Sequence, residues 1–286
     1  MELTTLNIFL QVSQCKSLSK AAISLGMAQS HVSTKIQQLE KELCTELLVR
    51  HNKGVELTGA GEILADYAQR ILRLVNDAEK TLHAGASHGN LRISAMQSTA
   101  QSFLPAMLSE FHQAYPDYRI RMLSGNALTN IDRVLRYECD FAYVAGDVNS
   151  AELACLRLTE ERMVVVCDRH LSSIEQYFQE DDASVVAFPS GCAYRRHFEE
   201  YLSEHGIVPK NVIEYDSIPA ILASVCAGMG VAALPGHIIN SQVQEGVLCS
   251  YELPDNFSFI PLNLCYRNNL KLNEAMQFFI KINQKM

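Results

Sequence analysis

The chain has 286 residues with 48% hydrophobic and 20% charged side chains, a composition that supports a buried core and excludes a disordered protein. No apolar run reaches the roughly 20 residues that cross a bilayer, and the first residues do not form a secretory signal. We therefore expect a cytoplasmic protein with no membrane contact. The net charge of −8 arises in residues 91–286, since residues 1–90 are neutral, so the acidity does not exclude DNA binding by the first part of the chain.

Residues 1–43 have the spacing of three short helices. Ser17 stands at the N-cap of the second helix, and Gly26 ends that helix because glycine readily adopts positive φ. The third helix, about residues 28–43, places Val32, Ile36 and Leu39 on one face. Two short helices joined by a tight turn indicate a helix-turn-helix. Residues 47–50 and 55–57 predict a β-hairpin, a wing with a basic tip at residues 51–54.

The third helix and the wing carry the side chains that we expect to contact DNA. Opposite its apolar face, the helix begins with short, uncharged polar residues, whereas a merely solvated face usually favours Glu and Lys. That solvated face is the alternative, but short polar side chains suit base edges in the major groove and basic ones suit phosphates. The expected contacts are Gln29, Ser30, His31, Ser33, Thr34, Lys35, Gln38, Arg50, His51 and Lys53.

Thr58 is placed to cap a long helix over residues 59–84. Apolar residues recur along it at near-heptad spacing, so one seam of the helix needs a partner. We expect this seam to form a dimer; packing on its own domain is the alternative. The seam comprises Ile63, Tyr67, Ile71, Leu74, Ala78 and Leu82. The small and polar residues 85–90 then predict a hinge.

Residues 91–286 alternate between strand and helix patterns, which predicts an α/β domain. Strands are expected at residues 91–95, 118–123, 141–144, 163–167, 185–188, 212–215, 231–234 and 259–266. Helices are expected near residues 103–115, 128–136, 194–205, 218–227 and 273–282. Open α/β sheets bind ligands at the carboxyl ends of their strands, so a small-molecule site is expected there.

Residues 6–72 resemble the winged helix-turn-helix of the LysR-type transcriptional regulators, and the similarity extends over the whole chain. Residues 191–195 and 227–230 resemble the YofA-like branch of that family. Ser30 and Thr34 stand where Pro and Arg are frequent in the family, which bears on base readout; Cys44 and Leu48 replace a usual Gly and Phe. The matching residues are Phe9, Val12, Ser17, Ala21, Ala22, Leu25, Gln29, Val32, Ser33, Ile36, Leu39, Glu40, Leu47, Arg50, Leu57, Thr58, Ala60, Gly61, Glu62 and Tyr67.

The resemblance implies a fold class and a set of partners. An α-rich winged helix-turn-helix (residues 1–58), a linker and dimerisation helix (59–84) and a hinge (85–90) would precede a two-lobed α/β effector-binding domain (91–286) like that of periplasmic binding proteins. Lobe I would comprise residues 91–161 and 266–286, and lobe II residues 162–265. The implied partners are a dyad-symmetric double-stranded DNA operator, a small-molecule effector and further copies in a dimer or tetramer, with RNA polymerase as a further candidate.

Helix N-termini at the strand ends offer free N–H groups, so the expected effector is small and anionic. The alternative is that Ser98 and Ser190 only cap helices. Asn126 and Ala145 enter the expected site through the family resemblance. The expected effector contacts are Ser98, Thr99, Asn126, Ala145, Cys192, Ala193 and Tyr194.

The nine cysteines form no C-x-x-C pair and no zinc-ligand spacing, so we expect no metal, no cofactor and mostly free thiols. Cys192 stands at a helix start before Arg195 and Arg196, a setting that should lower its pKa. A thiol-based redox sensor is therefore the alternative function, although a thiol that only lines the pocket is the interpretation we favour. An α/β enzyme is the least favoured alternative, because the chain has no G-x-S-x-G elbow, no phosphate loop and no H-E-x-x-H pair.

Overall fold

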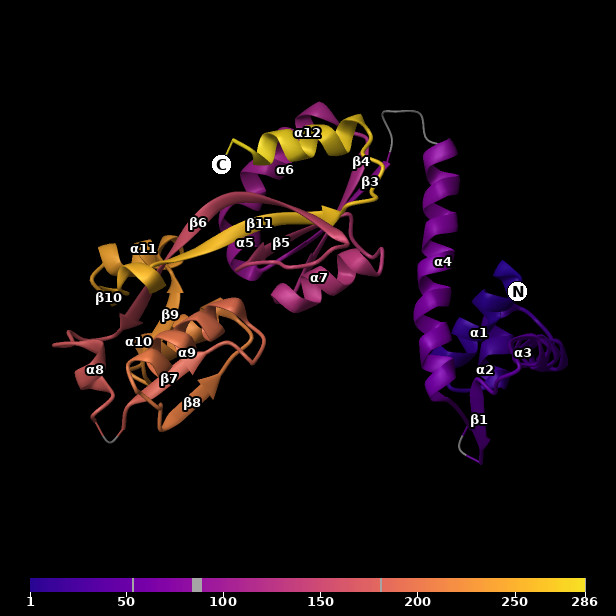
Figure 1. Cartoon of the computed structure of the whole chain (residues 1–286), viewed down its shortest axis with the longest axis horizontal. Helices are drawn as coiled ribbons and strands as arrows, with labels where there is room; N and C mark the ends of the chain where they lie inside the picture. Colours follow the sequence, from indigo (N-terminus) through magenta and orange to yellow (C-terminus); the bar gives the residue numbers. More distant parts are fainter. Residues whose placement is uncertain (53, 84–88, 181, 286) are drawn as a thin grey trace. The chain divides into compact units, whose positions relative to one another are not determined.

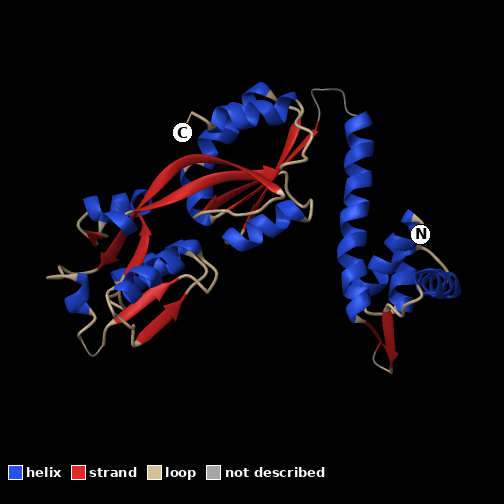
Figure 2. Cartoon of the chain, viewed as in Figure 1, coloured by secondary structure: helices blue, strands red, loops and turns tan. Residues whose placement is uncertain are grey.

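The computed structural model describes residues 1–52, 54–83, 89–180 and 182–285, which form two compact units, Met1–Gly85 and Ala86–Met286. The secondary structure of each unit is shown in Figure 2. Among the described residues, no helix is both long and apolar enough to cross a membrane. The first unit is mainly helical and the second is α/β, as the sequence predicts.

The first unit is a winged helix-turn-helix followed by one long helix. Its elements are α1 (Leu3–Cys15), α2 (Leu18–Leu25), α3 (Gln29–Leu43), β1 (Leu48–His51), β2 (Gly54–Leu57) and α4 (Gly59–His83). The apolar faces of α1 and α3 meet in one core, where Phe9, Val32 and Ile36 are fully buried. The wing is an antiparallel pair in which Leu48 lies opposite Leu57. The helix-turn-helix and the wing are therefore confirmed.

Two glycines fix the geometry of this unit. Gly26 adopts φ 65° at the turn between α2 and α3, a conformation that costs glycine little, and its N–H donates to the end of α2. Gly61 lies against the wing, because a Cβ at this position would come within 2.1 Å of the Leu47 carbonyl oxygen. The turn and the wing both require the small residue at these positions.

The second unit is built on one mixed sheet that runs through two lobes. In lobe I, β3 pairs in parallel with β4 and β5, and β5 pairs antiparallel with β11. Phe141 and Tyr143 of β5 are fully buried beneath the helices. The elements of lobe I are β3 (Gly89–Ala95), α5 (Gln97–Ser102), α6 (Leu104–Ala114), β4 (Tyr118–Ser124), α7 (Ala127–Leu135), β5 (Phe141–Ala145) and α12 (Glu274–Asn283).

Lobe II contains the far end of the same sheet and a separate parallel pair, β7 and β8. Its elements are α8 (Ile174–Tyr177), β7 (Ser184–Ala187), α9 (Ala193–Glu204), β8 (Asn211–Glu214), α10 (Ile218–Cys226), β9 (Ala232–Pro235), α11 (Gly236–Gln244), β10 (Cys249–Glu252) and the short 3-10 turn η1 (Asp255–Phe257). Helices α8 and α11 and strand β10 were not predicted from the sequence. These elements are short or partly exposed, so their apolar patterns are weak.

Two long antiparallel strands, β6 (Leu153–Cys167) and β11 (Phe259–Arg267), connect the lobes, as Figure 1 shows. The predicted strand at residues 163–167 is only the buried end of β6; in the rest of the strand every residue except the buried Glu161 is partly or fully exposed. The predicted lobe boundary at residue 265 also needs correction. β11 pairs with β5 from Leu262 onward, so its second half belongs to the sheet of lobe I.

The start of the second unit differs from the predicted hinge. β3 begins at Gly89, and both Gly89 and Asn90 pair with β4. The strand therefore extends two residues before Leu91, where the apolar pattern of the sequence begins. The remaining predicted hinge residues, 85–88, lie outside the described residues.

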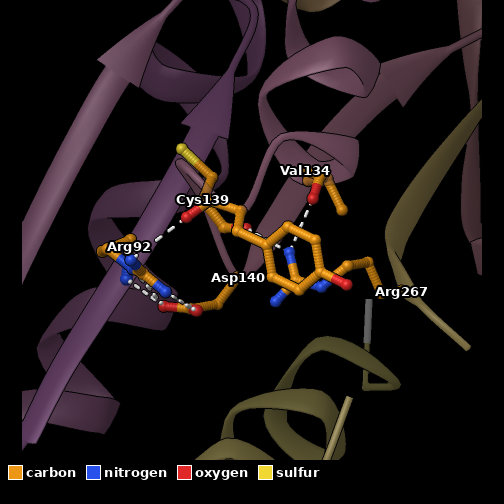
Figure 3. Close-up of polar contacts among 6 residues, drawn as sticks. Arg92, Val134, Cys139, Asp140 and Arg267 are labelled. Carbon is orange, nitrogen blue, oxygen red and sulfur yellow. Dashed lines mark hydrogen bonds and ion pairs between the residues drawn. The ribbon is translucent and has the colours of Figure 1, made fainter. Parts of the chain in front are cut away.

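Two arginines anchor the segment that follows α7 to lobe I (Figure 3). Arg92 pairs with the buried carboxylate of Asp140 at 2.7 Å and also donates to the Tyr137 carbonyl oxygen. Arg267 donates to the carbonyl oxygens of Val134 and Cys139 and lies 4.1 Å from the Tyr137 ring centroid. Cations at a helix C-terminus stabilise its carbonyl groups, so this cluster fixes the end of α7.

Candidate functional site

The outer face of α3 is exposed and polar. Ser17 caps α2, and α3 follows the Gly26 turn, so the first residues of α3 stand at the surface of the helix-turn-helix. Ser33 is half-buried. The exposed residues among the predicted DNA contacts on α3 are Gln29, Ser30, His31, Thr34 and Gln38. Gln29 Oε1 accepts a hydrogen bond from the Ser19 hydroxyl, and the Thr34 hydroxyl donates to the Ser30 carbonyl oxygen. This face of α3 is nevertheless accessible to an external partner.

Lys35 differs from its neighbours on α3. Its Nζ lies 2.9 Å from the Glu2 carboxylate, and this lysine lowers the pKa of Glu2 by hydrogen bonding and charge. A phosphate contact from Lys35 therefore requires that pair to open.

The wing presents two of its three predicted basic contacts. Arg50 and His51 are exposed on β1, and Nε2 of His51 lies 3.5 Å from the Glu56 carboxylate across the hairpin. Lys53 lies outside the described residues. The Glu40 carboxylate accepts hydrogen bonds from the Leu47 and Leu48 N–H groups, so the base of the wing is fixed to α3.

Helix α4 has a buried face and an exposed face. Ala65 and Ala68 are buried against the core of the first unit, and Ile71 is half-buried beside them. The predicted seam members Ile63, Tyr67, Leu74 and Ala78 are exposed, with 64%, 54% and 44% exposure for the first three. The Leu82 side chain lies outside the described residues. Apart from Ile71, the described seam faces away from the helix's own core.

In the second unit, the predicted effector residues follow the carboxyl ends of the strands. β3 leads into Ser98 and Thr99 of α5, and β7 leads through a short loop to Cys192 at the N-cap of α9. Asn126 caps α7 by accepting a hydrogen bond from the Thr129 N–H. Asn126 also lies beside the loop before α9, since a Cβ on Gly191 would be 3.7 Å from its Nδ2. Strand ends from both lobes therefore meet at one place.

Buried hydrogen bonds join the lobes there. The Ser98 and Tyr194 hydroxyls lie 2.7 Å apart, and the Tyr194 hydroxyl donates to Glu161 Oε2 at 2.6 Å. Gln97 accepts from the Ile218 N–H and donates to the Asp216 carbonyl oxygen. Ser98, Thr99 and Tyr194 are all buried, as are Ala145 and Ala193. The described conformation is thus closed at this point.

Three polar atoms around this network are buried and make no hydrogen bond to any described residue: Thr99 Oγ1, Glu161 Oε1 and His237 Nε2. The last two lie 3.8 Å apart, and the His237 ring packs on Phe103 with centroids 5.0 Å apart. Burial raises the pKa of Glu161 to about 7, and burial lowers the pKa of His237. Burial, followed by the charge of Glu161, also raises the pKa of Tyr194.

Glu161 and His237 were not among the residues predicted from the sequence. Glu161 stands in the charged run Glu160–Glu161–Arg162, which is typical of an exposed turn, and its burial depends on the pairing of β6 with β11. His237 is an isolated histidine with no motif around it. Among the described residues, no group of three or more His, Cys, Asp or Glu could hold a metal ion.

The expected lowering of the Cys192 pKa was wrong. Burial raises the pKa of its thiol and outweighs the lowering effect of the α9 N–H groups and of Arg195 and Arg196. Both arginines are paired with carboxylates, Arg195 with Glu199 and Glu214 and Arg196 with Glu200, so their charge is largely compensated. A raised pKa disfavours the reactive thiolate and weakens the redox-sensor alternative at this residue.

Two family models and several relatives are similar to this chain over most of its length. Residues 3–62 match the family model described as bacterial regulatory helix-turn-helix protein, lysR family, and residues 84–285 match the LysR substrate binding domain. The chain is 33% identical to the HTH-type transcriptional regulator GltR of Bacillus subtilis, covering 98% of this chain and 95% of the relative. It is 34% identical to the regulator YofA of Bacillus velezensis, covering 97% and 96%.

Solved structures show the same fold. Full-length CbnR in complex with its target DNA aligns with a TM-score of 0.71 at 18% identity, covering 100% of this chain and 99% of that one. A full-length OxyR from Pseudomonas aeruginosa aligns with a TM-score of 0.65 at 20% identity, covering 100% and 94%.

Proposed function

This chain belongs to the LysR family of bacterial transcriptional regulators, and from this premise we propose that it binds operator DNA through α3 and the wing and changes that binding when a small molecule enters between its lobes. We place this regulation in the cytoplasm, where the DNA of a bacterium lies. The proposed role requires no catalytic step.

The exposed polar face of α3 is the observation that carries the DNA-binding part. An α-helix fits the major groove, where glutamine pairs with adenine and serine or threonine contact several base edges. Gln29, Ser30 and Thr34 stand in the first half of α3, which follows the Gly26 turn, and all three are exposed. Arg50 of the wing supplies a phosphate contact beside them.

Dimerisation through α4 completes the DNA-binding part. The exposed residues Ile63, Tyr67, Leu74 and Ala78 repeat at steps of four, seven and four, which is the spacing of a two-helix seam. Two copies would place two α3 helices on a dyad-symmetric site, and dimers would associate further into a tetramer.

Selection of bound duplexes from a random double-stranded DNA pool tests this proposal directly. The wild type should enrich a motif with dyad symmetry. A variant carrying Gln29→Ala, Ser30→Ala and Thr34→Ala should enrich none, while the matched variant Gln113→Ala, on an exposed position of α6, should enrich the wild-type motif. Enrichment of the same motif by the triple variant would remove α3 from base recognition.

For the effector, the unpartnered atoms at Thr99, Glu161 and His237 support the position between the lobes. A ligand that reaches them replaces the Ser98–Tyr194 contact and pairs the buried groups, whose lack of partners costs free energy. An anion is expected at the helix N-termini, and a hydrogen-bond donor group at the Glu161 carboxylate. A thermal-shift screen of metabolites tests this: a binder should raise the melting temperature of the wild type and lose this effect in Ser98→Ala.

A further inference from the structure

Cys155 and Cys265 form a disulfide that joins the two strands connecting the lobes, although no sequence pattern marks either residue. They lie directly opposite each other in the antiparallel pairing of β6 and β11, and they are bonded through their sulfur atoms. Their Cα atoms are 4.2 Å apart, the separation of the close pairs in an antiparallel ladder. The bond therefore forms between side chains that strand pairing alone brings together.

The two cysteines differ in their access to solvent. Cys265 is completely buried, because β11 lies between β5 and β6 in the sheet of lobe I. Cys155 is exposed, and among the described strands only β11 pairs with this part of β6, since β9 and β10 pair with residues 163–167. One cysteine is thus open to a small oxidant or reductant, while the other is held beside it in the core. This arrangement places a thiol that an oxidant can reach beside a resolving thiol at bonding distance.

The position of the pair gives the bond a consequence. The register between β6 and β11 shifts between Leu262 and Asn263, two residues before Cys265, and this irregularity separates the pair from the part of the ladder that enters lobe II. A covalent link at Cys155 and Cys265 fixes the strand register on the lobe I side of the bulge. Reduction leaves that register to hydrogen bonds alone.

We propose that Cys155 and Cys265 are a reversible redox site, oxidised to the disulfide by hydrogen peroxide and reduced by a dithiol. The Cys155 thiolate attacks one peroxide oxygen, the O–O bond breaks, and the hydroxide released takes a proton to become water. The resulting sulfenic acid is attacked by the Cys265 sulfur, which has given up its proton, and the S–O bond breaks to release a second water. The two thiols lose two electrons, and one peroxide is reduced to two waters.

This site is distinct from Cys192, for which burial disfavours the thiolate. It is also independent of the proposed effector, since none of the residues around the Ser98–Tyr194 contact takes part. A test of the redox chemistry at Cys155 and Cys265 therefore has an outcome independent of the proposed function.

Thiol counting on the full-length protein tests the proposal. The reduced chain has nine thiols, so after peroxide treatment, denaturation and alkylation with N-ethylmaleimide the intact mass should show seven adducts instead of nine. A non-reducing peptide map should join the peptides that contain Cys155 and Cys265, and dithiothreitol should restore nine adducts. Cys192→Ser should still lose two thiols, whereas Cys155→Ser should lose none.

Three results would overturn the proposal: nine adducts after peroxide, an equal loss of thiols in Cys155→Ser, or a bond that dithiothreitol does not reduce in the folded protein. The peptide map is made on the wild type, so the test does not depend on the folding of any variant. As a second readout, oxidation should raise the melting temperature of the wild type and leave that of Cys155→Ser unchanged, because the link restrains the unfolded chain.

Discussion

The α3 surface and the junction between the lobes are both rich in polar side chains, but they present them in opposite ways. On α3, Gln29, Ser30 and Thr34 are exposed, and the hydrogen bonds that Gln29 and Thr34 make are at the surface. Between the lobes, Ser98, Glu161 and Tyr194 are buried and bonded to one another. The first surface is accessible to a large partner, whereas the second must open before a ligand can enter. A fixed surface suits DNA, and a junction that opens suits control of it.

The largest expected effect concerns the exposed seam of α4. The double substitution Tyr67→Asp and Leu74→Asp places repelling charges in the seam and should convert the dimer to monomers. Operator affinity should then fall on the order of 10²-fold or more, because the two half-sites are no longer bound together. Sedimentation velocity and fluorescence anisotropy measure both effects. Val208→Asp, at an exposed apolar residue outside the seam, is the control and should change neither; a dimer that persists in the double variant would contradict the seam.

The next largest effect concerns Glu161, at the buried junction between the lobes. Its pKa is raised from 4.5 to about 7, so between these pH values the folded state binds more protons than the unfolded state. The contribution of Glu161 to the free energy of unfolding is fully present below pH 4.5, declines as the pH rises to about 7 and is constant above pH 7. The decline should amount to about 3 kcal/mol.

Glu161→Gln should abolish this decline, because the amide keeps the acceptor for Tyr194 and does not ionise. Urea unfolding followed by circular dichroism from pH 5 to 8 measures the difference. Glu160→Gln, at the exposed neighbouring position on β6, should retain the wild-type pH dependence. A parallel pH dependence in Glu161→Gln and the wild type would show that the carboxyl ionises normally.

On the exposed α3 surface, Gln29→Ala should weaken binding to the specific DNA sequence by about 1–3 kcal/mol and leave binding to scrambled DNA unchanged. The reason is that a base contact contributes to sequence discrimination, whereas phosphate contacts do not. Gln113→Ala provides the same substitution on another exposed helix. An equal loss on both DNA sequences would assign Gln29 to the backbone.

A smaller effect separates two basic residues of the first unit, Arg50 and Lys35. Arg50→Ala should reduce the slope of log affinity against log salt by about 1, since one phosphate contact and its counterion release are lost. Lys35→Ala should leave the slope unchanged, because Lys35 is already paired with Glu2. A reduced slope in Lys35→Ala would show that the pair opens on DNA.

The smallest effect concerns Cys192. Thiol labelling of this residue across pH should give a pKa above that of a free cysteine, because burial raises it. Comparison with Cys192→Ser identifies its signal. A pKa below that of free cysteine would restore the redox-sensor alternative at this position.

The sequence predicted best those features that depend on local patterns. Ser17 and Gly26 mark the ends of α2 by their own conformational preferences, and the spacing of Val32, Ile36 and Leu39 defines the buried face of α3. Features that depend on strand pairing could not be predicted. The first half of β6 lacks a clear apolar alternation, so neither the burial of Glu161 nor the pairing of Cys155 with Cys265 could be read from the chain.

The central claim is sequence-specific DNA binding, and the most direct measurement is a salt-titrated anisotropy assay on the selected duplex and on a scrambled duplex of equal length. The proposal predicts saturable binding about a thousandfold or more tighter to the selected duplex, with affinity for both duplexes falling as salt increases. Equal affinity for the two duplexes at every salt concentration, or no binding even at low salt, would contradict it.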